Sequence, residues 1–409
     1  GKSLKLHYEE PINIVRGEGV YLISKNGRKY LDTINNVAHV GHENESVVIE
    51  GQNQMSILNT NSRYLHKSIN ELAEEIIQTL PEKLNVIHFV NSGSEANELA
   101  VRMMKSHTGS NDIIVSENGY HGNTNICVDI SSYKFDGKGG KGAPENTHVI
   151  PMPTKFNGKH KGEEACEGYI NEIKNSIKNL KSKNRDLGGF IIEPIISCGG
   201  QVELPDGFLK TAYDLIRENG GICISDEVQV GCGRLGESFW GFELHDVIPD
   251  IITIGKPLGN GHPIGAVVCT SEIAESFANG MEFFNTFGGN PVSCSIATQV
   301  LKVVKNENLQ KNAKTIGNYF KNELKNLSHK YDIIGDVRGQ GLFLGIEFVD
   351  HKMNPLFRET KYIVNRLKDF GILASLDGPN NNVIKIKPPL IFNKDNCDTF
   401  IFYLNKILE

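Results

Sequence analysis

The chain has 409 residues, of which 39% are hydrophobic and 22% charged, and its formal net charge is −6. This length predicts about two or three domains with a large buried core. The negative balance argues against nucleic-acid binding, which usually needs a basic stripe, and no apolar run is long enough to predict a membrane span. The eight cysteines form no C-x-x-C pair, so we expect no metal site and reduced thiols in a cytoplasmic protein.

The N-terminal part begins with two strand-like runs, at 20–23 and 29–31, on either side of Asn26-Gly27, a pair typical of a β-hairpin turn. Residues 68–80 have helical apolar spacing and end at Pro81. From about 84 to 295, short apolar strands alternate with amphipathic helices; we expect strands at 86–90, 113–115, 190–192, 222–224 and 251–254, and helices at 165–180 and 207–219. This alternation predicts an α/β fold with a mainly parallel sheet covered on both faces.

The C-terminal part reads as a smaller α+β domain. A long helix is expected to begin near Pro291, a second helical stretch covers 305–330, and strands near 333–349 and 383–387 enclose a helix at 357–369. We therefore expect an N-terminal segment at 1–50 that joins the small domain, a large domain at 51–295 and a small domain at 296–409.

Lys256 is the only formally charged residue between 251 and 271. It follows a strand that looks buried, and burial lowers the pKa of a lysine and makes its amine a nucleophile for carbonyl groups. The alternative is a lysine at a strand end that extends its amine to water. This context alone does not choose between the two.

Asp226 ends the strand at 222–225 and precedes Lys256 by 30 residues. Ligands of open α/β sheets bind at the carboxyl ends of the strands, where both residues are expected. A buried carboxylate there needs a cation, which the protonated nitrogen of a pyridine ring would supply. The alternative is an aspartate that caps the next helix.

Two further segments follow predicted strands. Residues 91–97, Asn-Ser-Gly-Ser-Glu-Ala-Asn, open a helix whose free N–H groups could bind a phosphate, or which has only an ordinary N-terminal cap. Tyr120-His121-Gly122 could stack on a flat ring, or be structural. A metal site formed by His39, His42 and His121 is not expected, because no cysteine or carboxylate has ligand spacing nearby.

Taken in order, these segments resemble the class III aminotransferase family of fold-type I pyridoxal-phosphate (PLP) enzymes. The resemblance runs from about residue 12 to 395. Its motifs are N-S-G-S-E-A-N-E (91–98), Y-H-G (120–122), E-P (193–194), D-E-V-Q-V-G-C-G-R (226–234), G-K-P-L-G-N-G-H-P (255–263), N-T-F-G-G-N-P (285–291) and G-D-V-R-G-Q-G-L (335–342).

The resemblance implies a catalytic set. Lys256 would hold PLP as an imine and move protons, Asp226 would pair with the pyridine nitrogen, and Glu193 would join the hydrogen-bond network near the cofactor. Gln229 would contact the 3-oxygen of the ring. Thr286 would reach the phosphate of the neighbouring subunit's cofactor, which implies a homodimer with shared sites and leaves a tetramer open.

The resemblance also implies contacts to the rest of the cofactor. Gly93 and Ser94 would bind its phosphate. Tyr120 or His121 would stack on one face of the ring, and Val228 would pack on the other face.

Within the family, the chain looks most like the branch of phospho-lyases that act on ethanolamine phosphate and phosphohydroxylysine. The segments that carry this likeness are 34–42, 58–66, 255–263 and 377–389. Many ω-aminotransferases of the family have an arginine where this chain has Lys385, and several have a glutamate where it has Cys198. Arginine's fork suits a planar carboxylate, whereas lysine can meet a phosphate as a point charge.

We therefore expect an enzyme that acts on a small primary amine and eliminates phosphate and ammonia from an O-phosphorylated amino-alcohol. Candidate phosphate contacts are Arg63, His39, Lys385 and Lys387, each of which could instead be a solvated surface charge. The first rival is an ω-aminotransferase that moves a terminal amine to pyruvate or 2-oxoglutarate. The second is a non-catalytic binding protein with the same fold, against which the intact Lys256 and Asp226 argue.

Overall fold

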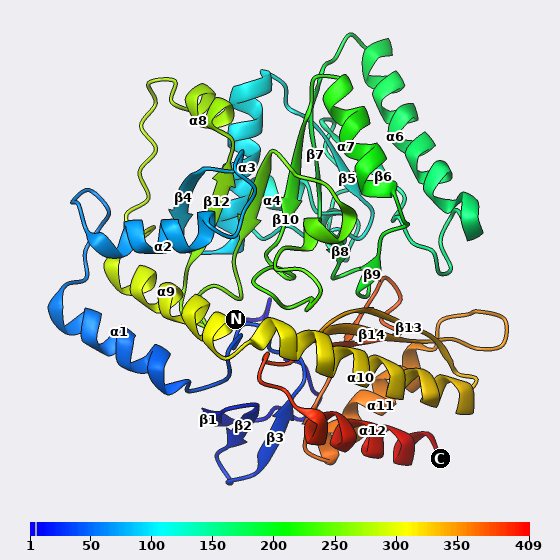
Figure 1. The fold of residues 1–409 in the computed structure, drawn as a ribbon. Coiled ribbons are helices and arrows are strands. Elements are labelled where there is room, and N and C mark those ends of the chain that lie inside the picture. Colours follow the sequence, from blue (N-terminus) through cyan, green and yellow to red (C-terminus); the bar gives the residue numbers. More distant parts are fainter. Residues whose placement is uncertain (5) are drawn as a thin grey trace.

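The computed structural model describes residues 1–4 and 6–409 (Figure 1). Its helices are α1 (Glu45–Ile57), α2 (Lys67–Ile77), α3 (Gly93–Thr108), α4 (Asn125–Asp129), α5 (Ser132–Phe135), α6 (Ala165–Ser182), α7 (Phe208–Glu218), α8 (Ser271–Phe277), α9 (Pro291–Asn306), α10 (Leu309–Lys330), α11 (Phe357–Asp369) and α12 (Lys394–Leu408), with short 3-10 turns at Gly162–Glu164 and Gly241–His245. Within the described residues, no helix combines the length and apolarity needed to cross a bilayer.

A seven-stranded sheet forms the centre of the larger part of the molecule. Its order is β4 (Val86–Val90), β12 (Gly265–Cys269), β11 (Ile251–Ile254), β10 (Ile222–Asp226), β7 (Leu187–Ile192), β5 (Asp112–Ser116) and β6 (Thr147–Ile150). Only β12 runs against its neighbours, so the predicted mainly parallel sheet is confirmed. No strand at 265–269 was predicted from the sequence. Its antiparallel direction could not be predicted either, because apolar periodicity does not give strand direction.

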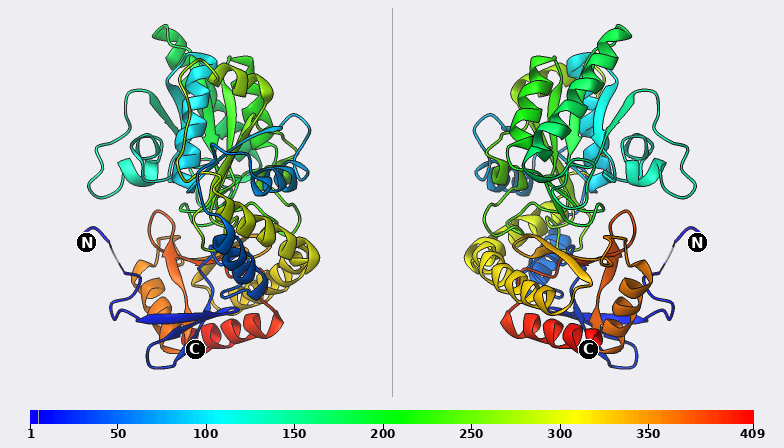
Figure 2. Two further views of the ribbon diagram at one scale, coloured as in Figure 1. Left: turned by 90° about the vertical axis from the view of Figure 1, so that its left-hand side faces the viewer. Right: turned by 90° about the vertical axis from the view of Figure 1, so that its right-hand side faces the viewer.

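Helices cover both faces of this sheet, and strand alternation decides which side chains meet which helices (Figures 1 and 2). Ile222 and Ile224 of β10 belong to the core on the α3 side, whereas Cys223 belongs to the core shared with α6 and α7. Successive side chains of a strand point to opposite faces. Asp226 therefore shares the face of Ile222 and Ile224, toward α3.

The smaller part of the molecule contains residues from both the N-terminal and the C-terminal segments of the chain. A sheet of β1 (Ile14–Glu18), β2 (Tyr21–Ser24), β3 (Lys29–Asp32) and β15 (Ile372–Leu373) includes the predicted hairpin at Asn26-Gly27. A second sheet contains β13 (Ile334–Gln340), β14 (Phe343–Phe348), β17 (Val383–Ile386) and β16 (Ser375–Asp377), and the short pair β8 (Ile195–Ile196) and β9 (Val202–Glu203) lies apart. Leu31 and Phe400 lie in one hydrophobic core, and Figure 1 shows the first strands beside the last helix.

Helix α10 lies close to the turn between β13 and β14 because Gly317 has no side chain. A Cβ atom at Gly317 would lie 2.1 Å from the carbonyl oxygen of Gly341. Backbone cannot move aside as a flexible side chain can, so this contact fixes the spacing between the helix and the turn.

We expect Gly317→Ala to lower the free energy of unfolding by about 1–3 kcal/mol, because the new methyl group overpacks this contact. Thr315→Ala, at an exposed position of the same helix, is the matched control and should change it by less than about 0.5 kcal/mol. Denaturant unfolding of both variants checks this; equal stabilities would contradict it.

Candidate active site

A cavity of ≈ 290 Å³ lies where β4, β5, β10 and β11 reach their carboxyl ends. The sequence-predicted residues that line it are Gly93, Ser94, Tyr120, His121, Asp226, Val228, Gln229 and Lys256. The fold thus brings together side chains from segments up to about 160 positions apart in the chain, at the edge where open α/β sheets bind ligands.

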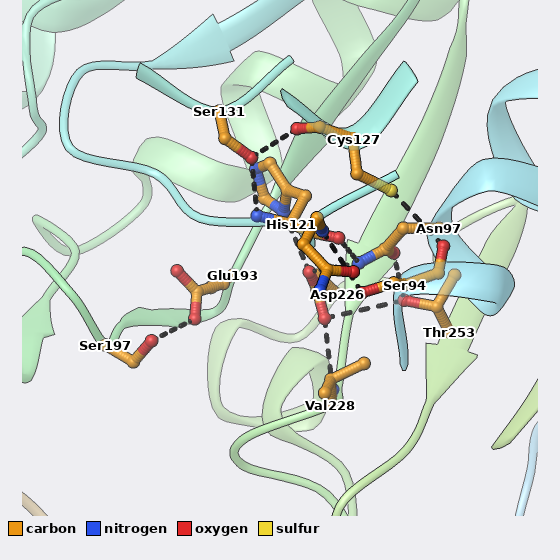
Figure 3. Close-up of polar contacts among 11 residues, drawn as sticks. Ser94, Asn97, His121, Cys127, Ser131, Glu193, Ser197, Asp226, Val228 and Thr253 are labelled. Atoms are coloured by element: carbon orange, nitrogen blue, oxygen red, sulfur yellow. Dashed lines mark hydrogen bonds and ion pairs between the residues drawn. The ribbon is translucent and has the colours of Figure 1, made fainter. Parts of the chain in front are cut away.

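The carboxylate of Asp226 is the centre of a buried hydrogen-bond network (Figure 3). Oδ2 accepts from Asn97 Nδ2 and pairs with His121 Nδ1, both at 2.8 Å. Oδ1 accepts from the backbone N–H of Val228 at 3.1 Å. The hydroxyl of Thr253 lies 3.5 Å from Oδ1 and donates to Asn97 Oδ1 at 2.7 Å, which holds Asn97 in place. No lysine or arginine among the described residues pairs with this carboxylate, which is 2% exposed.

His121 is fixed by the same network. Its backbone N–H donates to Ser131 Oγ and its carbonyl accepts from Asn97, both at 2.8 Å. Its Nε2 atom is buried and has no partner among the described residues. The carboxylate of Asp226 is buried and has no lysine or arginine partner among the described residues, which indicates a cationic ligand in the cavity.

The start of α3 forms a cradle for an anion. Ser92 caps the helix by accepting from Glu95 N–H at 3.2 Å, and the described hydrogen bonds include none from the N–H groups of Gly93 and Ser94. A Cβ atom at Gly93 would lie 2.7 Å from Val228, so only glycine allows this approach. Free N–H groups at a helix N-terminus are suited to a phosphate. The residues present therefore fit PLP: the free N–H groups of α3 suit a phosphate, and the buried carboxylate of Asp226 suits a protonated ring nitrogen.

The amine of Lys256 has no hydrogen-bond or ion-pair partner among the described residues, and it lines the same cavity. It follows β11, whose Thr253 lies beside Asp226 in register on β10. Gly255 keeps this segment close to the cradle, because a Cβ atom there would lie 3.0 Å from Val228 and 3.1 Å from Gly93. The free amine and the carboxylate thus share one cavity.

Glu193 is buried behind the cavity and does not line it. Oε1 accepts from Ser197 Oγ at 2.5 Å, while Oε2 has no partner among the described residues. Burial, and then the negative charge of Asp226, raises the pKa of Glu193 to about 7. Figure 3 shows the Glu193–Ser197 pair apart from the Asp226 network.

His39 was expected to contact a substrate phosphate, and its position contradicts that role. The side chain is fully buried and does not line the cavity. Nε2 faces the carbonyl oxygen of Cys232 at 2.8 Å, so it carries the ring proton, and Nδ1 accepts from Arg234 at 3.3 Å. Burial, followed by the nearby Arg234, lowers the pKa of His39 to about 3, so the ring is neutral and both nitrogens are engaged.

Arg63 and Thr286 lie on an exposed surface rather than in the cavity. Arg63 pairs with Glu282 through both terminal nitrogens, at 3.0 and 3.3 Å, and its guanidinium lies 3.9 Å from the centre of the Phe284 ring. Any contact of these two residues with a ligand in this cavity would need a second copy of the chain.

Lys385 and Lys387 lie next to the cavity. Lys387 Nζ donates to Gln229 Oε1 at 3.2 Å, and Lys385 pairs with Asp377 at 3.4 Å. Burial, and then the charge of Lys385, lowers the pKa of Lys387 to about 7. Burial alone would also lower the pKa of Lys385, but the carboxylate of Asp377 raises it.

The sequence reading did not single out Asn97 or Thr253. Asn97 stands four residues after Gly93, on the same face of α3, and Thr253 precedes Lys256 by three. Helical spacing from the predicted cradle could have found Asn97. Thr253 could not be found without the strand register.

We expect Glu193→Gln to stabilise the protein at high pH. Because the folded pKa of about 7 exceeds the ordinary value of 4.5, the wild type loses stability as pH rises through this interval. At pH 8.5 the variant should gain about 1–3 kcal/mol in unfolding free energy over the wild type, and far less at pH 4.5. The exposed Glu307→Gln is the control; a difference that does not depend on pH would contradict the expectation.

Comparisons with known proteins identify the family of the chain. The family model described as aminotransferase class-III matches residues 5–408. A Drosophila melanogaster protein named alanine–glyoxylate aminotransferase 2-like is 44% identical over 418 residues, which cover 100% of this chain and 85% of that protein.

Two further relatives carry phospho-lyase names. Ethanolamine-phosphate phospho-lyase homolog 1 of Caenorhabditis elegans is 37% identical, over 100% of this chain and 91% of that protein. The solved structure of a phospholyase from Arthrobacter in complex with phosphoethanolamine is similar with a TM-score of 0.95 and 35% identity, over 99% of this chain and 96% of that one. The chain belongs to the class III aminotransferase family, and it is a PLP-dependent enzyme of fold type I.

Proposed function

We propose that this enzyme is a phospho-lyase that eliminates phosphate and ammonia from an O-phosphorylated amino-alcohol such as ethanolamine phosphate. The observation that carries the proposal is the pair of lysines, Lys385 and Lys387, beside the cavity. Lys385 pairs with the carboxylate of Asp377, Lys387 donates to Gln229, and both amines are largely removed from water. Such a site attracts a compact dianion more than a planar carboxylate, for which arginine's fork is better suited.

The relatives support this choice without deciding it. The Arthrobacter structure contains phosphoethanolamine, and one relative is named a phospho-lyase homologue, whereas another is named an aminotransferase. An ω-aminotransferase that uses pyruvate or 2-oxoglutarate is therefore the second candidate.

The cavity residues would hold PLP in one orientation. We propose that Gly93 and Ser94 bind its phosphate, that Asp226 keeps the ring nitrogen protonated, and that Gln229 contacts the 3-oxygen. The ring would lie between Val228 and an aromatic side chain, for which the cavity offers Tyr120 and His121. When bound in this way, PLP supplies an electron sink for a carbanion at the substrate carbon that bears the amine.

The chain's own groups would then carry the proton and the leaving group. Lys256 Nζ would hold the cofactor, and its amine would be the base that takes the proton from the substrate carbon that bears nitrogen. Lys385 and Lys387 stabilise the phosphate that leaves the neighbouring carbon, and Glu193 supports the network behind the cavity. With one water, ethanolamine phosphate yields an aldehyde, ammonia and phosphate, and no keto acid is consumed.

We also propose a homodimer, which leaves further pairing into a tetramer open. Large apolar side chains are exposed on two adjoining segments, 55–65 and 281–287, which the Arg63–Glu282 pair holds together. Phe287 is 70% exposed and Leu65 is fully exposed. A second copy on this surface would bury them and bring Thr286, and with it Arg63, toward the partner's cavity.

The eight cysteines are free, in keeping with the expected cytoplasmic location.

We expect phosphate release from ethanolamine phosphate without any keto acid. Lys256→Ala should abolish it, and Lys385→Met should lower kcat/KM about 10- to 100-fold, since a charged contact to the leaving group is lost. A coupled phosphate assay, run with and without pyruvate, measures this. Phosphate that appears only with pyruvate, or never, would overturn the lyase in favour of the aminotransferase.

We expect the wild type to sediment at twice the monomer mass or more. Leu65→Glu combined with Phe287→Glu should give monomers, because two charges would be buried without partners. Phe402→Glu, an exposed aromatic on α12, is the control. A double variant that sediments like the wild type would show that this surface is not the dimer interface.

A further inference from the structure

We propose that Asn36 and Lys387 are positioning residues that fix the side-chain amide of Gln229, so that its Nε2 group faces the cavity and donates to the 3-oxygen of PLP. This inference rests on the PLP site proposed above, and it does not depend on whether the reaction is a lyase or a transaminase.

The three side chains form a buried polar cluster. Gln229 Oε1 accepts from Asn36 Nδ2 at 2.8 Å and from Lys387 Nζ at 3.2 Å. Asn36 is 3%, Lys387 6% and Gln229 7% exposed. Gln229 lines the cavity, and its Nε2 has no acceptor among the described residues. The amide is thus bound on its oxygen side only.

Two donors on one side determine which way the amide points. A lysine ammonium can only donate, and the NH₂ group of an asparagine does the same. If the Gln229 amide were reversed, its own NH₂ group would meet these donors, and buried groups would lose their hydrogen bonds. The cavity therefore receives a hydrogen-bond donor rather than an acceptor.

The backbone holds the two partners in place from distant parts of the chain. The N–H of Lys387 donates to the carbonyl of Thr33 at 2.7 Å, and the N–H of Leu390 donates to the carbonyl of His39 at 2.8 Å. The segment after β17 thus lies against the loop that carries Asn36. The loop that carries Asn36 and the segment that carries Lys387 would thus position Gln229 at the cofactor site.

The charge of Lys387 acts in the same direction. Burial and the charges of Lys385 and Lys256 lower the pKa of Lys387 to about 7, while Asp377 and Cys198 act to raise it, so the charge is present below that pH. A donor and a cation near the 3-oxygen compete for it with the protonated nitrogen that joins Lys256 to the cofactor. They lower the pH at which this nitrogen loses its proton, which is seen as a change of the cofactor's absorbance.

The test is an absorbance titration of the PLP-loaded enzyme. In Lys387→Met we expect the midpoint pH of the titration of the nitrogen that joins Lys256 to PLP to rise by about one unit. This is the order of effect of one nearby charge. Asn36→Ala should raise it less. Asn36→Asp should raise it more than Asn36→Ala, because a carboxylate there would accept from Gln229 Nε2 and turn Oε1 toward the cavity.

Lys321→Met, which removes a half-buried lysine paired with Glu203, is the matched control and should leave the midpoint unchanged. If Lys387→Met does not fold, the two Asn36 variants decide. Midpoints of the Asn36 and Lys387 variants within about 0.2 units of the wild type would overturn the inference. If the midpoints shift but the enzyme releases no phosphate, the positioning of Gln229 is upheld and only the proposed phospho-lyase reaction is contradicted.

Discussion

A buried carboxylate, that of Asp226, without a lysine or arginine partner among the described residues is the constraint on which the site depends. Asp226 accepts hydrogen bonds from Asn97 and the Val228 backbone and pairs with His121, yet no lysine or arginine of the described chain neutralises it. Taking such a charge out of water is costly unless a positive group meets it. These partners hold the carboxylate in one orientation and leave a cationic group to the ligand.

The rest of the architecture follows from this need. Strand alternation turns Asp226 toward α3, whose N-terminus can take the phosphate at the other end of the same ligand. Lys256, just after the adjacent strand, lines the same cavity and has no partner among the described residues. The smaller part of the molecule adds Lys385 and Lys387 beside that cavity, where they can select what the substrate carries.

Much of this site could be predicted from the sequence, because its residues directly follow short apolar strands. Lys256, Asp226 and the segment at 91–97 were identified in this way. Thr253 could not be, since its role depends on the register between β10 and β11. His39 was misassigned because the sequence does not show which loop side chains face the cavity; its contacts with Cys232 and Arg234 show it buried and neutral. The direction of β12 also came only from its pairing.

The central claim is that Lys256 carries the cofactor opposite Asp226. Borohydride reduction of the PLP-loaded enzyme, followed by peptide mass spectrometry, tests it most directly. The account predicts a reduced pyridoxyl group on Lys256 and none on Lys385 or Lys387, and the loss of this label in Lys256→Ala. A label on another lysine of the wild type, or no label at all, would contradict it.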